Sequence, residues 1–171
     1  RRESAQVWYE RAHQLDPKAF RWLYYLGSLQ SALGKRAEAT ATLRAALSLN
    51  PDYLPAQLKL AENLLAAGDW GEAAGIYEAI VKQHPDAAEA YYGIGRIRAG
   101  NGDLAAAKEA HQMACQLFPA YGAAHYALAQ AYRKLGDSSS AEEHLKLHTA
   151  NRTLVPPVPD PLNDEMRALD R

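Results

Sequence analysis

The sequence has little cysteine and no excess of basic residues. Cys115 is its one cysteine in 171 residues, so an intrachain disulfide is excluded and both cytosol and periplasm stay open as compartments. The net charge of −1 gives no basis for bulk binding to nucleic acid or anionic lipid, which calls for a strong basic excess. No apolar run suggests a membrane span. We therefore expect an ordinary soluble, globular chain.

Proline and glycine, in contrast, recur with a fixed period of 34 residues. The proline series is Pro17, Pro51, Pro85 and Pro119, and the glycine series is Gly34, Gly68, Gly102 and Gly136. Two interleaved series with one period indicate a stacked array of repeats. We therefore look for function on the surface that the array presents, rather than in a single sequence motif.

Each period contains two amphipathic segments that predict helices. The predicted helices cover residues 4–14, 18–33, 36–48, 54–67, 70–83, 88–100, 104–117, 121–135 and 138–150. A glycine of the second series follows the first helix of each pair, where a left-handed residue lets the chain turn back. A proline ends the second helix, because proline cannot continue a helix.

Small residues recur where the helices of a pair must approach closely. Gly27, Ala61, Gly95 and Ala129 follow a large aliphatic residue in the first helices. Ala39, Ala73, Ala107 and Ala141 occupy one position of the second helices, and four residues later stand Leu43, Tyr77, His111 and Leu145. This pattern of small and large residues at a 34-residue period resembles the tetratricopeptide repeat family.

The resemblance covers about residues 4–153 and implies an all-α fold. It implies a right-handed superhelical solenoid of about four and a half antiparallel helix pairs, whose concave groove is lined by the first helix of each repeat. We expect a half repeat at 4–17 and repeats at 18–51, 52–85, 86–119 and 120–153. The chain begins at Arg1 in the middle of a repeat, so we expect it to be part of a longer protein.

The period ends at Thr153, and residues 154–171 predict a proline-rich strap followed by a short helix. Asp160 and Pro161 form an N-cap and a first helical residue, and Leu162, Met166 and Leu169 share one face of a helix that ends near Asp170. A helix this short needs a surface to dock on. We expect it to cap the last helix pair; the alternatives are that it enters the groove of its own or a neighbouring molecule, or that it is disordered.

First-helix residues at a constant distance from the prolines should line the groove. The candidate binding residues are Arg21, Tyr24, Ser28, Leu58, Lys59, Glu62, Tyr92, Arg96, Tyr126, Gln130 and Arg133. With the flanking Glu89 and Lys134, this surface has five basic and two acidic groups, and residues 154–170 are acidic. Tyrosine and arginine suit the gripping of a peptide, so we expect a partner with acidic character and a tail that inhibits the groove.

We expect the third and fourth repeats to hold a ligand most firmly, because the second repeat places Leu58 and Glu62 where its neighbours have Tyr92 and Arg96. Some family members grip a C-terminal carboxylate with lysine and asparagine. The corresponding positions here lack the asparagine, so we do not expect that clamp.

Histidine and cysteine are the remaining candidates for chemistry. His144 and His148 have the i, i+4 spacing that can share a metal ion, but no third ligand stands nearby in sequence. His111, His125 and Cys115 fall at packing positions, and Cys115 lacks an obvious base. We therefore expect no metal, no cofactor and no catalytic residues.

These observations favour a non-catalytic protein-protein interaction scaffold that binds a protein or peptide in its groove. Two alternatives stay open. The chain could be a self-assembly module that pairs through the N-terminal half repeat or the C-terminal tail, or the regulatory portion of a larger enzyme whose chemistry lies outside these residues.

Overall fold

The computed structural model describes residues 2–169, and all regular structure in that range is α-helical. The helices agree with the predicted ones to within two residues at each end, because the apolar periodicity and the turn residues specify the same boundaries. The chain divides into two compact units. Unit 1 comprises residues 2–69 and 158–169, unit 2 comprises residues 70–157, and each is described by itself.

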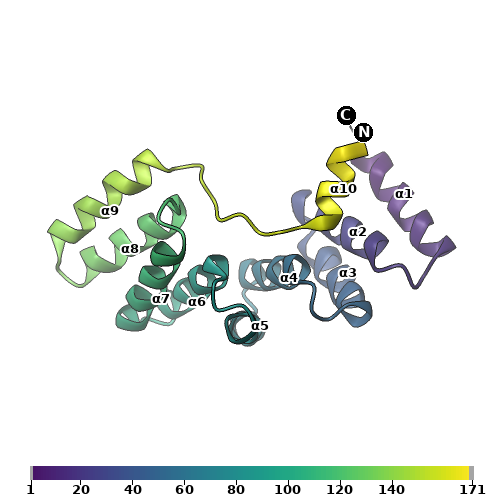
Figure 1. The fold of residues 1–171 in the computed structure, drawn as a ribbon. Helices are drawn as coiled ribbons and strands as arrows, with labels where there is room; N and C mark the ends of the chain where they lie inside the picture. The colour runs from purple at the N-terminus through teal and green to yellow at the C-terminus, as the bar shows by residue number, and fades with distance from the viewer. Residues whose placement is uncertain (1, 170–171) are drawn as a thin grey trace. The chain divides into compact units, whose positions relative to one another are not determined.

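Unit 1 contains four consecutive helices and the last helix of the chain. They are α1 (Arg2–Leu15), α2 (Phe20–Ala32), α3 (Arg36–Leu49), α4 (Leu54–Ala67) and α10 (Pro161–Leu169). Helices α2 and α3 form an antiparallel pair, with α1 packed on α2 and α4 packed on α3 (Figure 1). Leu26, Leu43, Leu60 and Leu64 are buried between them.

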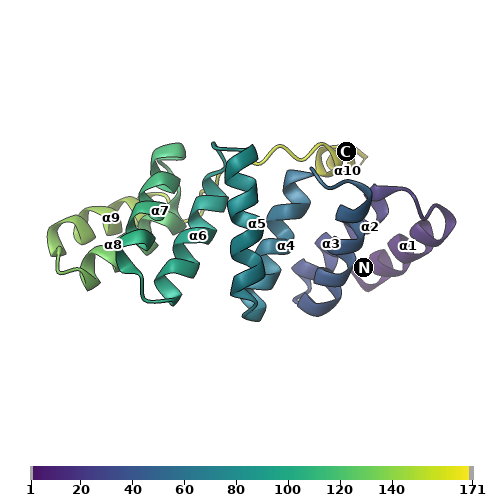
Figure 2. The same ribbon diagram turned by 90° about the horizontal axis from the view of Figure 1, so that it is seen from below.

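Unit 2 contains five helices in the same arrangement. They are α5 (Trp70–Gln83), α6 (Ala88–Gly100), α7 (Leu104–Leu117), α8 (Gly122–Lys134) and α9 (Ser138–Ala150). Helices α6 and α7 pair, as do α8 and α9, and their neighbours pack side by side (Figure 2). The core around Ala114, Ala124 and Leu128 also holds Cys115 and Tyr121.

The turn glycines adopt the left-handed conformation that the sequence predicts. Gly34, Gly68, Gly102 and Gly136 have φ angles of 75°, 93°, 83° and 86°. No other described residue has a positive φ, so the sharp turn inside each helix pair depends on this series alone.

The small residues lie at close helix contacts, as predicted. Ala39, Ala73 and Ala107 are fully buried. A side chain on Gly27 would lie 2.8 Å from Leu43, and one on Gly95 would lie 2.4 Å from the His111 ring. The helices of each pair can approach this closely only because these positions have almost no side chain.

After α9 the chain runs without helix or strand from residue 151 to residue 160 and then forms α10. The predicted helix was expected to end near Asp170, which lies outside the described residues. No helix in the described part of the chain is long and apolar enough to cross a membrane.

Candidate functional site

The first helices of unit 1 carry six of the predicted binding residues. Tyr24 is buried, Ser28, Leu58 and Lys59 are half-buried, and Arg21 and Glu62 are exposed. Tyr24 is only 1% exposed, although it was predicted to line an open groove. The chain's own C-terminal segment accounts for part of that burial.

Asp160 is the residue of the tail that contacts Tyr24. The Tyr24 hydroxyl donates a hydrogen bond to Oδ2 of Asp160, and the Tyr53 hydroxyl donates one of 2.7 Å to Oδ1. Asp160 Oδ1 also accepts from the backbone N–H of Asn163 at 3.1 Å, so the same carboxylate caps α10. One carboxylate thus both starts the helix and anchors it to unit 1.

Leu162 gives the tail a second anchor. Its carbonyl oxygen accepts a hydrogen bond of 2.8 Å from the Tyr25 hydroxyl. Its side chain helps to line a cavity of about 450 Å³ with residues that surround the start of α2, including Phe20, Arg21 and Trp22. The contact is therefore both polar and apolar.

Aromatic packing holds the tyrosines in place. The ring centroids of Tyr24 and Tyr53 lie 5.0 Å apart in an edge-on arrangement, and Phe20 lies 4.9 Å from Tyr53. Burial, followed by the hydrogen bond to Asp160, raises the pKa of both Tyr24 and Tyr53. Both hydroxyls therefore stay protonated and act as donors at neutral pH.

The prediction that the tail caps the last helix pair is wrong. Its Asp160 and Leu162 bind Tyr24, Tyr25 and Tyr53 of unit 1 instead. Figure 1 shows α10 beside α2. The tyrosine hydroxyls donate hydrogen bonds to the Asp160 carboxylate and to the Leu162 carbonyl, and the aromatic rings offer apolar surface beside Leu162. The contact uses neutral tyrosines rather than the basic residues that the charge pattern had suggested.

Unit 2 carries the other five predicted binding residues. Tyr92 lies against the Arg96 guanidinium, with 5.6 Å between the guanidinium carbon and the ring centroid. Tyr126 is 48% exposed and its ring lies 5.2 Å from that of His148. Gln130 is half-buried and Arg133 is exposed.

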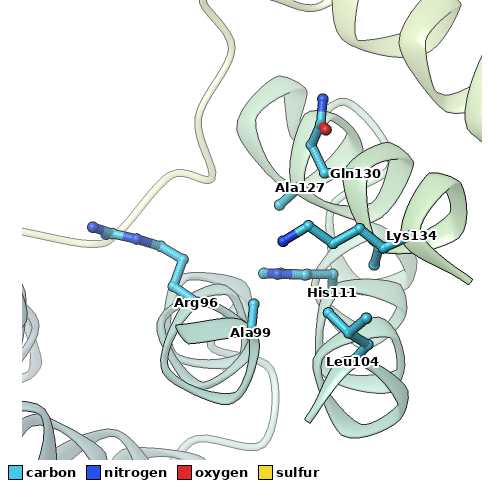
Figure 3. Close-up of a pocket in the computed structure, with 8 residues that line it drawn as sticks. Arg96, Ala99, Leu104, His111, Ala127, Gln130 and Lys134 are labelled. Carbon is cyan, nitrogen blue, oxygen red and sulfur yellow. The ribbon is translucent and has the colours of Figure 1, made fainter. Parts of the chain in front are cut away.

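Two of these residues meet in a pocket of about 290 Å³. Arg96 of α6 and Gln130 of α8 line it with His111 of α7 and Lys134 of α8, while Leu104 and three alanines supply an apolar wall. Figure 3 shows the side chains of His111 and Lys134 extending from α7 and α8 toward α6. Tyr92, Tyr126 and Arg133 are not part of this pocket.

His111 is the least accessible polar group of the pocket. It is 2% exposed, and its Nδ1 has no hydrogen-bond partner. Burial, and then the charge of Arg96, lowers the pKa of His111 to about 4. At neutral pH the pocket therefore contains two cations, Arg96 and Lys134, beside a neutral imidazole.

Two models of the tetratricopeptide repeat match the chain, one at residues 58–122 and the other at residues 23–53 and 122–147. Together they cover most of its length. The chain belongs to the tetratricopeptide repeat family. Folds of this family are in general non-catalytic protein-interaction scaffolds.

Solved tetratricopeptide repeat structures resemble most of the chain. MamA from Desulfovibrio magneticus RS-1, in a form running from residue 41 to its end, is 25% identical with a TM-score of 0.78, over 88% of this chain and 85% of that one. YrrB, a repeat protein with an unusual peptide-binding site, is 21% identical with a TM-score of 0.70, over 99% of this chain and 82% of its own. The likeness to YrrB shows the fold alone. A search of the curated proteins found no match.

The tetratricopeptide repeat pattern did not reveal every residue of these two surfaces. Tyr53 lies just before α4, outside the first-helix positions, and Asp160 was predicted as a helix cap rather than as a bound group. His111 was predicted as a packing residue. The repeat period offers one clue to Tyr53. The equivalent positions two repeats and one repeat later are Tyr121 and Ala87, so an aromatic residue recurs at this position just before a first helix.

His125 and Cys115 are buried, and His144 and His148 are half-buried. His125 bonds to Nδ1 of His144 at 2.9 Å and to the Pro119 carbonyl at 2.8 Å, whereas His148 bonds to the Gly122 carbonyl. His144 and His148 thus have different partners. Burial raises the pKa of Cys115 to about 11. The expectation that Cys115 has no base beside it is wrong, because its Sγ lies 3.4 Å from Nδ1 of His125, which the helix pairing brings close. Among the described residues, no group of three or more His, Cys, Asp or Glu side chains could hold a metal ion.

Proposed function

We propose that the chain is a non-catalytic interaction scaffold that binds a peptide or protein segment of acidic character on its first helices. The observation that carries this proposal is the tail itself. An acidic segment of ordinary protein chain is held on unit 1 by Tyr24 and Tyr25 of α2 and by Tyr53, which precedes α4. A surface that binds this segment has the chemistry to bind a similar one from a partner.

The pocket of unit 2 supports the same role. Arg96 and Lys134 offer positive charge, and Gln130 offers an amide, beside an apolar wall. Arginine can bind a carboxylate through two parallel hydrogen bonds, which suits an Asp or Glu side chain of a peptide. The exposed ring of Tyr126 adds apolar contact area on α8, the helix that also carries Gln130 and Lys134.

A peptide-library screen against the full chain tests this function. We expect acidic peptides to be enriched, and we expect replacement of Tyr92, Arg96 and Tyr126 together by alanine to weaken binding of the enriched peptides at least ten-fold. The matched control replaces three exposed second-helix residues, Glu109, Gln116 and Lys146, by alanine. Binding that survives the first triple replacement would contradict the proposal.

Self-association is a second candidate, favoured by exposed apolar residues on α1. Val7, Trp8 and Leu15 are 61%, 69% and 82% exposed, and Trp8 and Leu15 lie seven residues apart on one face of the helix. We propose that this face meets a second copy of the chain. Light scattering over a range of concentrations tests the idea: mass should rise with concentration for the wild type and not for Trp8→Glu. A monomer at every concentration would exclude it.

A further inference from the structure

We infer that unit 1 contains a binding site for a short segment in which an aspartate caps a helix and an aliphatic residue follows two positions later, and that Asp160–Leu162 occupies it as an internal ligand. This inference rests on the proposed scaffold function and names one of its ligand classes. The tail then regulates the site, because a partner that carries such a segment must displace it.

The site recognises a carboxylate without using a positive charge. Two hydroxyl donors, from Tyr24 and Tyr53, reach the two different oxygens of Asp160. Within the described part of the chain, Asp160 takes part in no ion pair. The hydroxyls sit among aromatic rings, where a hydrogen bond to a charged acceptor is stronger than in water.

This arrangement distinguishes aspartate from asparagine. Both Asp160 oxygens accept, and an amide would replace one of them with an NH₂ group, which cannot accept the hydrogen bond that a tyrosine hydroxyl now donates. Oδ1 already accepts from both the Tyr53 hydroxyl and the N–H of Asn163, so an amide would have to turn its NH₂ group toward Tyr24, and its remaining hydrogen bonds would no longer go to a charged acceptor. The site therefore recognises a carboxylate in the N-cap position of a helix, rather than negative charge in general.

The residues after Asp160 add further selectivity. Pro161 is the first residue of α10, where its fixed φ suits the start of a helix. Leu162 lines the cavity with Phe20 and Trp22, and its carbonyl accepts a hydrogen bond from Tyr25. The recognised class is thus Asp-Pro followed by an aliphatic residue at the start of a short helix.

The tyrosines of unit 1 are held in place by their neighbours, whereas the short helix α10 has little stability of its own. Tyr24 and Tyr25 lie on α2 within an aromatic cluster that includes Phe20 and Tyr53, so little side-chain freedom is lost on binding. Helix α10 has nine residues, and six of the eight from Pro161 to Ala168 are exposed, so it is marginal as an isolated helix. Its occupancy depends on the strap, which holds it near unit 1 at a local concentration on the order of millimolar.

The test frees the site without shortening the chain. In the full chain, Asp160→Asn and Leu162→Ala together should release the tail. A fluorescent peptide with the wild-type sequence of residues 157–169 should then bind this variant at least ten-fold more tightly than it binds the wild-type chain, as measured by anisotropy.

Two peptide variants with equal net charge separate the clamp from general electrostatics. A peptide with Asp160→Asn should bind the released variant at least ten-fold more weakly, while a peptide with Asp164→Asn should bind like the wild-type peptide, since Asp164 pairs only with the exposed Arg167. Equal binding of all three peptides would overturn the inference.

Variants of the receptor complete the design. Tyr53→Phe keeps the ring and removes the hydroxyl, so it should weaken binding of the wild-type peptide to the released variant. Tyr91→Phe in unit 2 is the matched control and should not. Failure of the peptide to bind the released variant overturns this inference alone if library peptides still bind through Tyr92, Arg96 and Tyr126. Loss of both kinds of binding overturns the proposed function as well.

Discussion

Tyr24, Tyr92 and Tyr126 stand at the same position of the first, third and fourth repeats but have different environments. Tyr24 is buried under the tail, Tyr92 is half-buried beside Arg96, and Tyr126 is the most exposed of the three. A tyrosine side chain suits all three environments, because its ring can pack against other side chains while its hydroxyl forms a hydrogen bond with a partner or with water. What each tyrosine does therefore depends on its neighbours.

His111 is a residue whose burial makes stability depend on pH. Its pKa is lowered to about 4, first by burial and then by Arg96, whereas an unfolded histidine has a pKa of about 6.5. Between these values the unfolded chain binds more protons, so stability is complete above pH 6.5 and falls as the pH drops toward 4. We expect this residue to lower the free energy of unfolding by about 2 kcal/mol at pH 5 relative to pH 8.

Urea unfolding of the wild type and His111→Gln at both pH values measures this effect. The variant should lose less stability than the wild type between pH 8 and pH 5, because it has no imidazole to protonate. An equal loss in both proteins would show that His111 is not the responsible group.

At the scale of the helix, close packing depends on glycines that face aromatic rings. Gly93 of α6 faces the ring of Tyr77 on α5, and Gly95 faces the ring of His111 on α7. Helix α6 can thus approach both of its neighbours. The conformational freedom of these glycines is a disadvantage within a helix, and the packing they permit offsets it.

Replacement of Gly95 by alanine tests this packing. The added Cβ would lie 2.4 Å from two atoms of the buried His111 ring, so we expect a loss of about 1–3 kcal/mol in the free energy of unfolding. Gly75→Ala on α5 is the control: nothing lies within 4 Å of its new Cβ, and a gain of about 0.5–1 kcal/mol is expected. If both variants unfold at the same denaturant concentration, the contact is unimportant.

At the scale of the whole molecule, the two units each have a core of their own. Leu43 is fully buried in unit 1, and Leu128 is almost fully buried in unit 2. Repeat proteins are stabilised by contacts between neighbouring helices, so a local defect should have its largest effect nearby.

Hydrogen exchange of two cavity variants tests this independence. Leu43→Ala and Leu128→Ala should each lose about 2–5 kcal/mol of local stability. Amide protection should fall mainly in α2–α4 for the first variant and in α6–α9 for the second. Equal loss of protection across both units in either variant would indicate a single cooperative unit.

Much of the fold could be predicted because its determinants are local. The 34-residue series of proline and glycine marks the turns, and the apolar periodicity between them marks the helices. The buried alanine series could be predicted for the same reason, since a repeat places equivalent residues in equivalent contacts. Pocket residues such as Arg96 and Gln130 followed from their helical positions.

The contacts of the tail could not be predicted in this way, because they join residues far apart in the sequence. Asp160 meets Tyr24 across 136 residues and Tyr53 across 107. Nothing in the repeat period specifies where a segment outside it will dock, and the charge pattern suggested arginines where tyrosines bind.

The sequence by itself determined the helices, their turns and the family, since each depends on neighbours within one or two helical segments. Only the tertiary structure decided that Asp160 and Leu162 bind the tyrosines of unit 1, and that His111, whose Nδ1 has no hydrogen-bond partner among the described residues, lines a pocket with Arg96 and Lys134. The physical reason is that local periodicity specifies secondary structure, whereas a binding surface arises from side chains that only folding brings together.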